Sequence, residues 1–306
     1  MILVTGGLGM IGAHTASALV DLGHDVVVTA HRRTDVPLFL AGKVSVERLD
    51  VTDREAFLAL GDRYEISDIV HLAGGIPGAD PVGFFRTDTS GLLNALDAAR
   101  TWGVRRFAVA SSHGVYIGRT EIPWHEDLAL PTADLPHLII AFKKAIEPLT
   151  THSLQGTGVQ PVVLRIGSIW GPLMDPESPF NPIPPYVSAV LRGERLRPLH
   201  ADDGGDCCYA PDAGQAIALL ITAKTLRYTT YNVSSGRMFT NRDLADALQA
   251  IIPGLQLDLL PGRQNGPGAD PYLDITRLTQ DTGFTPAFDS AAAVAEYVAW
   301  RADNPR

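Results

Sequence analysis

Cysteine is nearly absent from this chain of 306 residues, which contains only Cys207 and Cys208. Two adjacent thiols provide neither a disulfide framework nor the ligands of a structural zinc site. The neighbouring Asp206 carboxylate would raise a thiol pKa rather than activate the sulfur. We therefore interpret both cysteines as small buried apolar residues.

The sequence also lacks long apolar runs and segments rich in lysine and arginine. No run approaches the ~20 residues that span a membrane. The formal net charge of -9 disfavours binding to the phosphates of a nucleic acid. A strand-like segment begins at position 2 and leaves no room for a signal peptide, so we expect a cytoplasmic protein with a small-molecule substrate.

Glycine, in contrast, is concentrated near the start, where the first fourteen residues read M-I-L-V-T-G-G-L-G-M-I-G-A-H. An apolar run is followed by Gly6, Gly9 and Gly12 and then by a helical pattern. Such glycines allow a tight turn and a close approach of the backbone, while the first helical N–H groups, here near Met10 and Ile11, attract a phosphate. The pattern predicts a pyrophosphate cradle; a structural turn without a ligand is the alternative.

Strand-like and helical segments alternate through the first half of the chain, which predicts an α/β fold with a doubly wound parallel sheet. The expected strands are 2–5, 25–29, 44–50, 69–73, 106–111 and 160–166, and the expected helices are 12–22, 53–64, 87–102 and 138–155.

The regular alternation of strand-like and helical segments ends after residue 170. Residues 171–185 include six prolines, which favour an irregular loop. We expect a dinucleotide-binding domain at 1–170, its sheet completed by residues near 206–236. A smaller C-terminal substrate-binding lobe would occupy most of 171–306. Further expected elements are helices at 186–192, 211–223, 241–252 and 290–302 and a strand at 231–233.

Seven short motifs occur in a specific order: TGGLGMIG at 5–12, LDVTD at 49–53, HLAG at 71–74, ASSHGVY at 110–116, LRIGSIWGP at 164–172, YNVSSG at 231–236 and DITRL at 274–278. Through them nearly the whole chain resembles the extended short-chain dehydrogenase/reductase family of the NAD-dependent epimerase/dehydratase type. The resemblance implies a Rossmann fold and a bound nicotinamide dinucleotide.

The resemblance also implies positions for that cofactor. Gly6, Gly9, Met10, Ile11 and Gly12 would hold the pyrophosphate, Asp50 and Val51 would flank the adenine, and Leu72, Ala73 and Gly74 would line the path toward the nicotinamide. Asp50 has an alternative role as the N-terminal cap of the following helix.

The end of the second strand indicates which dinucleotide is bound. NAD enzymes of this kind usually place an acidic residue there, but this chain has Ala30 followed by His31, Arg32 and Arg33. A carboxylate would repel a 2′-phosphate, whereas guanidinium groups pair with it. We therefore expect NADP rather than NAD; the alternative is that these arginines are only solvated loop charges.

The family's catalytic serine corresponds to Ser112 and its lysine to Lys143, with Glu147 four residues further on. The family's tyrosine would stand four residues before the lysine, where this chain has Ile139. No tyrosine occurs between Tyr116 and Tyr186. The usual proton-transferring group is therefore absent, although Lys143 retains a use as a donor to the cofactor ribose; otherwise it is an exposed helix lysine.

Four titratable residues near this segment are candidates to replace the tyrosine: His113, Tyr116, His125 and His137. His113 is favoured because histidine exchanges protons near neutral pH and this one follows Ser112. A purely structural, hydrogen-bonded His113 remains the alternative.

One position in the second half of the chain bears on the substrate. Nucleotide-sugar enzymes of the family usually carry a basic residue where this chain has Gly205, although Arg192, Arg195, Arg197 and Arg237 lie in the same half of the chain. We expect an oxidoreductase, epimerase or dehydratase acting on a sugar or another hydroxylated small molecule through a non-standard proton relay. The alternatives are a catalytically silent NADP-binding sensor or interaction protein, and an isomerase or lyase that uses its cofactor structurally.

The resemblance implies a homodimer formed through helices 87–102 and 138–155. Leu92, Leu93, Leu96 and Ala99 form an apolar stripe that would serve this contact or packing against the sheet.

Overall fold

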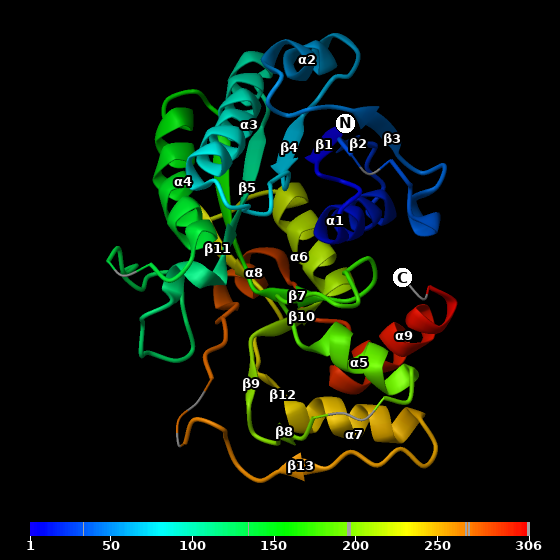
Figure 1. The fold of residues 1–306 in the computed structure, drawn as a ribbon. Coiled ribbons are helices and arrows are strands. Elements are labelled where there is room, and N and C mark those ends of the chain that lie inside the picture. Colours follow the sequence, from blue (N-terminus) through cyan, green and yellow to red (C-terminus); the bar gives the residue numbers. More distant parts are fainter. Residues whose placement is uncertain (33, 134, 195–196, 267, 269, 305–306) are drawn as a thin grey trace.

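A parallel sheet of seven strands forms the centre of the computed structural model, which describes residues 1–32, 34–133, 135–194, 197–266, 268 and 270–304 (Figure 1). The strands lie in the order β11-β6-β5-β4-β1-β2-β3, and all pairings are parallel. Their bounds are β1 Ile2–Thr5, β2 Val26–Ala30, β3 Ser45–Arg48, β4 Asp68–His71, β5 Arg106–Ser112, β6 Gln160–Ile166 and β11 Thr230–Val233.

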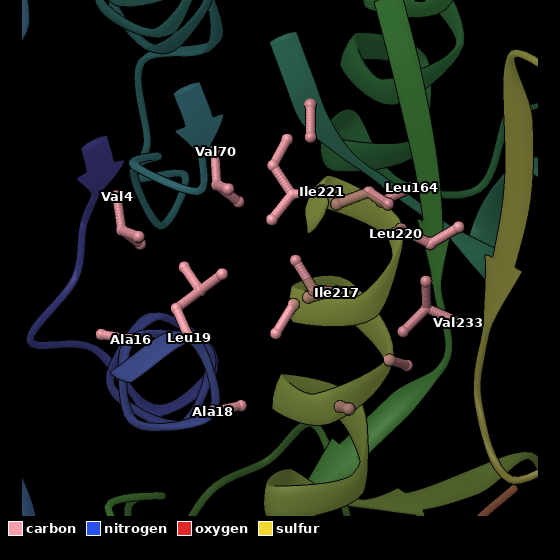
Figure 2. Close-up of a cluster of buried hydrophobic side chains, with 14 of the residues drawn as sticks. Val4, Ala16, Ala18, Leu19, Val70, Leu164, Ile217, Leu220, Ile221 and Val233 are labelled. Carbon is pink, nitrogen blue, oxygen red and sulfur yellow. The ribbon is translucent and has the colours of Figure 1, made fainter. Parts of the chain in front are cut away.

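Helices cover both faces of this sheet because alternate strand residues point to opposite sides. In β1, Val4 lies with Leu19 and Ile217 in one buried cluster (Figure 2), whereas Leu3 belongs to the cluster on the other face. α1 (Met10–Asp21) and α6 (Ala210–Thr222) cover the first face, and α2 (Arg54–Leu58), α3 (Pro81–Trp102) and α4 (Leu138–Leu154) cover the second. The predicted doubly wound α/β fold is confirmed.

A smaller group of elements lies beyond the carboxyl edge of the sheet (Figure 1). Its helices are α5 (Ile183–Leu191), α7 (Asn241–Ile251) and α9 (Ser290–Asp303), which share a separate apolar cluster containing Trp170, Leu248 and Tyr297. Short strand pairs accompany them: β7 (Ser168–Trp170) with β10 (Cys207–Tyr209), β9 (Gly204–Gly205) with β12 (Phe239–Thr240), and β8 (Leu199–His200) with β13 (Leu259–Leu260). The division into domains at residue 170 stays a prediction.

Several helices differ from their prediction. α2 ends at Leu58 rather than at residue 64, and a short 3₁₀ helix at Ala59–Asp62 follows it. α3 begins at Pro81 instead of residue 87, because Asp80 caps it by accepting a hydrogen bond from the Val82 N–H. α5 begins at Ile183, inside the proline-rich segment, since prolines are tolerated in a first helical turn. α8 (Thr276–Thr282) was not predicted; its sequence is mostly polar and only Leu278 is buried.

The strand order reverses direction at β1, which has β2 on one side and β4 on the other. Open α/β sheets bind ligands at the carboxyl edge beside such a point. Among the described residues, no helix is both long and apolar enough to cross a membrane.

Candidate functional site

The glycine turn between β1 and α1 leaves the start of the helix open. Gly9 is the N-cap residue, no side chain caps the helix, and its first turn, which opens with Met10 and Ile11, contains no acidic residue. Gly6 has a φ of +66°, and a Cβ on Gly12 would overlap the Gly6 carbonyl oxygen. The turn requires glycine, and its uncapped N–H groups fit an anionic pyrophosphate.

Thr5 ties the end of β1 to the end of β4. Its hydroxyl oxygen accepts hydrogen bonds from the N–H groups of Leu72 and Ala73, each at 3.2 Å. A Cβ on Gly6 would lie 3.0 Å from the Ala73 Cα, so the two loops approach closely. The exposed Gly74 follows directly. The predicted cradle and the predicted path toward the nicotinamide are therefore side by side.

Charged residues gather where β2 and β3 end. The side chains of His31 and Asp50 are exposed, with Nε2 and Oδ2 3.7 Å apart. Hydrogen bonds from the Thr52 N–H and hydroxyl, together with the charges of His31 and Arg32, lower the pKa of Asp50. Arg33 lies outside the described residues.

Asp50 does not cap α2, so that alternative was wrong. Asp53 is the N-cap residue, and its carboxylate accepts a hydrogen bond from the Ala56 N–H at 3.0 Å. Val51 is held against α3, where the Asn94 side-chain amide donates to its carbonyl oxygen at 2.9 Å. Asp50 therefore stays available beside the predicted adenine position.

Ser112 and His113 lie at the carboxyl end of β5. The Ser112 hydroxyl oxygen accepts a hydrogen bond from the Gly114 N–H at 3.1 Å. The His113 ring stacks on Trp124, with centroids 6.4 Å apart. Its Nδ1 is buried and has no hydrogen-bond partner in the described part of the chain. The alternative role for His113, a structural residue held by hydrogen bonds, does not account for this unpartnered nitrogen.

The side chain of Lys143 turns inward from α4. Its Nζ donates a hydrogen bond to the Ala110 carbonyl oxygen at 2.6 Å. Burial lowers the pKa of Lys143 to about 8, against the opposing charge of Asp88. Burial and the Lys143 charge lower the pKa of His71 to about 3, so that histidine is neutral near pH 7. The alternative of an exposed helix lysine was wrong.

Asp88, Lys143 and His71 border a cavity of about 10 Å³. The Asp88 carboxylate also accepts hydrogen bonds from the Gly75 N–H at 3.0 and 3.1 Å. The space suits about one water molecule. Asp88 was not predicted from the sequence; the available signal was an acidic residue on the helix stripe that continues with the buried Leu92 and Ala95.

Ile139 is partly buried and packs against the apolar cluster that α3 and α4 form with the sheet. The next residue, Ile140, lies against Gly114, where an added Cβ would be 3.1 Å from its Cγ1. Neither side chain can carry a proton.

The other candidate proton carriers have different surroundings. The Tyr116 hydroxyl is buried between the Asn232 side-chain oxygen and the Arg165 guanidinium, each at 2.8 Å, and burial raises its pKa to about 12. His137 caps α4 and accepts a hydrogen bond from the backbone of that helix, and His125 is exposed. This leaves His113 as the candidate that is both partly buried and unpartnered at one nitrogen.

The loop before β10 contributes a buried acid. Oδ1 of Asp206 accepts hydrogen bonds from the Ser234 hydroxyl at 2.8 Å and the Leu273 N–H at 3.0 Å. A Cβ on the neighbouring Gly205 would meet no atom within 4 Å, so a basic side chain would fit there. No cation is present at this position because the residue is glycine, and not because the surrounding structure lacks room for a basic side chain.

The arginines that might replace that cation differ in availability. Arg192 is already paired with Glu177 and Glu194, at 3.0 and 2.5 Å. Arg237 is exposed, and Arg195 lies outside the described residues.

Both cysteines are free, and burial raises the pKa of Cys207 to about 12. Cys208 is buried, as predicted, whereas Cys207 is only partly buried.

A larger cavity of about 290 Å³ lies beside α8. Its walls include Pro123, Gly236 and Asp274 and none of the predicted site residues.

Comparison with known proteins gives a consistent set of relatives. A model of the NAD dependent epimerase/dehydratase family matches residues 2–234. A UDP-glucose 4-epimerase of Erwinia amylovora is 24% identical over 343 aligned residues, which cover 100% of this chain and 98% of the relative. A dTDP-glucose 4,6-dehydratase of Streptomyces griseus is 28% identical over 317 residues, covering 98% and 93%.

Among solved structures, the UDP-glucose 4-epimerase of Thermotoga maritima, determined with UDP-glucose, superposes with a TM-score of 0.83. It is 22% identical and covers 100% of this chain and 99% of that one. This similarity supports the fold.

Proposed function

The chain belongs to the NAD dependent epimerase/dehydratase family, and we propose that it is an enzyme that binds a nicotinamide dinucleotide and acts on a hydroxyl group of a sugar or similar small molecule. The observation that carries this proposal is the position of Ser112, His113 and Lys143 at the same sheet edge as the uncapped glycine turn.

Each part of the cofactor has a proposed binding element. The turn from Gly6 to Gly12 holds the pyrophosphate, and Asp50 and Val51 flank the adenine. Leu72, Ala73 and Gly74 line the path to the nicotinamide, and the Lys143 ammonium donates to the ribose hydroxyls after leaving the Ala110 carbonyl.

A bound nicotinamide supplies a hydride acceptor or donor. The protein's own part is to orient the substrate hydroxyl through Ser112 and to exchange its proton. When a hydride leaves the substrate carbon, the hydroxyl proton moves to a ring nitrogen of His113, which thereby becomes an imidazolium. The tyrosine that usually takes this role in the family is replaced by Ile139 here.

The proposed dinucleotide is NADP. Ala30 leaves the end of β2 without an acid, and Arg32 lies beside it on the surface. Asp50 is nearby, with its Oδ2 3.7 Å from Nε2 of His31. The family model is described as NAD dependent, so the proposed preference for NADP rests on Ala30 and Arg32 of this chain and not on the family.

The proposed substrate class is a sugar, a sugar acid or another polyhydroxylated metabolite. The relatives named above act on nucleotide sugars, but Gly205 provides no cation for a diphosphate and Arg192 is neutralised by two glutamates.

The test is a screen of the purified protein loaded with NADP against free sugars, sugar acids and UDP- or dTDP-sugars, following reduced nicotinamide and product formation. A response to at least one hydroxylated compound is expected. No reduction and no product with any compound would overturn the proposed activity.

The loss of the tyrosine supports a second candidate, an NADP-binding sensor or interaction protein without turnover. This candidate gains if the protein binds NADP tightly yet gives no response in the same screen.

A homodimer through α3 and α4 is also proposed. Leu92, Leu96 and Ala99 are buried in the core and unavailable for it, but Val82 and Leu93 are 61% and 47% exposed. They are eleven residues apart on α3 and so lie on the same helix face. Light scattering of the purified protein decides between dimer and monomer.

A further inference from the structure

His113 and Asp206, at the carboxyl edge of the sheet, each have one buried polar atom without a hydrogen-bond partner among the described residues: Nδ1 and Oδ2. The indole Nε1 of Trp124, on which the His113 ring stacks, has no partner there either. Buried polar groups in folded proteins are almost always paired. Nδ1 of His113 and Oδ2 of Asp206 therefore each call for a partner, and each is of the type the other needs.

Ser112 and Ile166 are register partners in β5 and β6, so the next residues, His113 and Gly167, leave the sheet at neighbouring positions, and Oδ2 of Asp206 lies over Gly167. The His113 ring also stacks on Trp124, whose backbone pairs with Leu273, the residue whose N–H donates to Asp206.

The Asp206 carboxylate has a fixed orientation. The Ser234 hydroxyl and the Leu273 N–H both donate to Oδ1, and the Ser168 N–H donates to the Asp206 backbone carbonyl at 3.0 Å. Oδ2 occupies the space over Gly167, where any Cβ would overlap it. These contacts leave Oδ2 as the free acceptor.

His113 is also restrained, because its ring stacks on Trp124. The other ionisable groups that pack around the two loops already have partners. Tyr116 and Glu126 both bond to Asn232, Arg165 pairs with Glu147, Arg277 lies beside Glu126 and Asp127, and the Cys207 thiol contacts Asn181.

We propose that Asp206 is a positioning residue for His113, with its Oδ2 joined to the imidazole Nδ1–H through one bridging water. No direct hydrogen bond joins the two described side chains, and a single water is the shortest link that satisfies both atoms. The inference rests on the proposed function, in which His113 exchanges the substrate proton.

This arrangement determines which ring nitrogen reacts. With the Nδ1 proton held on the Asp206 side, Nε2 is the unprotonated nitrogen that takes the substrate's proton. The imidazolium that forms lies near the Asp206 carboxyl group; a buried carboxylate that orients a histidine is a recurring device in enzymes. This role of Asp206 was not predicted from the sequence, because the residue is 93 positions away from His113.

The substitution Asp206→Asn tests the link with a defined geometry. The asparagine carbonyl oxygen must take the Oδ1 position, because the Leu273 N–H there requires an acceptor. The amide NH₂ then takes the Oδ2 position and donates toward Nδ1, through the water. We expect the neutral His113 to change from the Nδ1–H to the Nε2–H tautomer.

The measurement is nitrogen NMR of the histidine-labelled protein without cofactor, with the His113 signal assigned from His113→Gln. The matched control is Asp212→Asn, which alters another buried carboxylate, one that accepts hydrogen bonds from the Ala287 and Phe288 N–H groups. Wild type and D212N should share the Nδ1–H tautomer. An Nε2–H tautomer in wild type, or an unchanged tautomer in D206N, overturns the inference.

Activity separates this inference from the proposed function. D206N should reduce turnover at least about tenfold, because the base nitrogen is now protonated. A tautomer change in D206N combined with a fully active His113→Gln variant would retain the link but remove His113 from catalysis. Loss of activity in H113Q with no tautomer change in D206N would retain His113 in catalysis but remove its link to Asp206.

Discussion

Glu147 on α4 and Arg165 on β6 form a buried ion pair, with Oε2 and Nη2 2.8 Å apart. Oε1 of the same glutamate accepts hydrogen bonds from the Ser111 hydroxyl at 2.5 Å and the Arg165 Nε at 3.1 Å. Ser111 precedes Ser112, and Glu147 follows Lys143 by about one helical turn. The pair therefore fixes the helix that carries Lys143 against the strand that carries Ser112.

Replacing Glu147 with glutamine should destabilise the protein by about 3–5 kcal/mol, because the Arg165 charge stays buried without a counter-ion. Urea unfolding measures the change. Glu194→Gln, which alters an exposed pair with Arg192, is the control and should leave the unfolding free energy nearly unchanged. Equal effects of the two substitutions would show that the buried pair does not anchor α4.

Acid should destabilise the protein partly through His14. Burial lowers the pKa of this histidine to about 4, from 6.5 when unfolded. The unfolded chain thus binds more protons between pH 6.5 and 4, and the His14 contribution is present above pH 6.5 and lost as the pH falls through that window.

His14→Gln should therefore flatten the decline of the unfolding free energy between pH 6.5 and 4. Thermal or urea unfolding across that range provides the comparison, with the exposed His24→Gln as control. A decline as steep in H14Q as in wild type would assign acid sensitivity to other groups, such as His71.

Arg32→Ala should weaken NADP binding about tenfold or more, the loss expected for a charge-assisted hydrogen bond to a phosphate. The affinity for NAD should not change, because NAD lacks the 2′-phosphate. Calorimetric titration with both dinucleotides measures this, and Arg54→Ala, on the exposed side of α2, is the control. A wild-type protein that prefers NAD tenfold would contradict the proposed NADP preference.

Ile139→Tyr restores the family's hydroxyl group four residues before Lys143. If the position still faces the substrate, the variant should be at least about tenfold faster than wild type, within the range of general acid–base catalysis. Ile139→Phe adds similar bulk without the hydroxyl and should not be faster. Equal rates for the two variants would mean that position 139 no longer faces the reacting group.

Local patterns in the sequence were sufficient to predict the alternating strands and helices in the first half of the fold. The apolar run before the glycines and the helix after them match β1 and α1 closely, because both elements bury nearly continuous apolar surface. α8 was missed because Leu278 alone anchors it, which leaves no periodic stripe to detect.

The candidate site could be predicted only in part. Gly6, Ser112 and Lys143 were predicted through the resemblance of short motifs to those of the family, and such motifs preserve spacing along the chain. The positions of Asp88 beside Lys143 and of Asp206 beside His113 depend on strand order and loop packing, so spacing could not reveal them. The inward direction of Lys143 likewise depends on the Ala110 carbonyl across the sheet edge.

The central claim is that His113 exchanges the substrate proton in place of the missing tyrosine. The most direct test compares the rate of nicotinamide reduction in wild type and His113→Gln at saturating NADP and substrate. The account predicts a fall of about 100-fold or more in H113Q, with the affinity for NADP unchanged. Equal rates in the two proteins would contradict it.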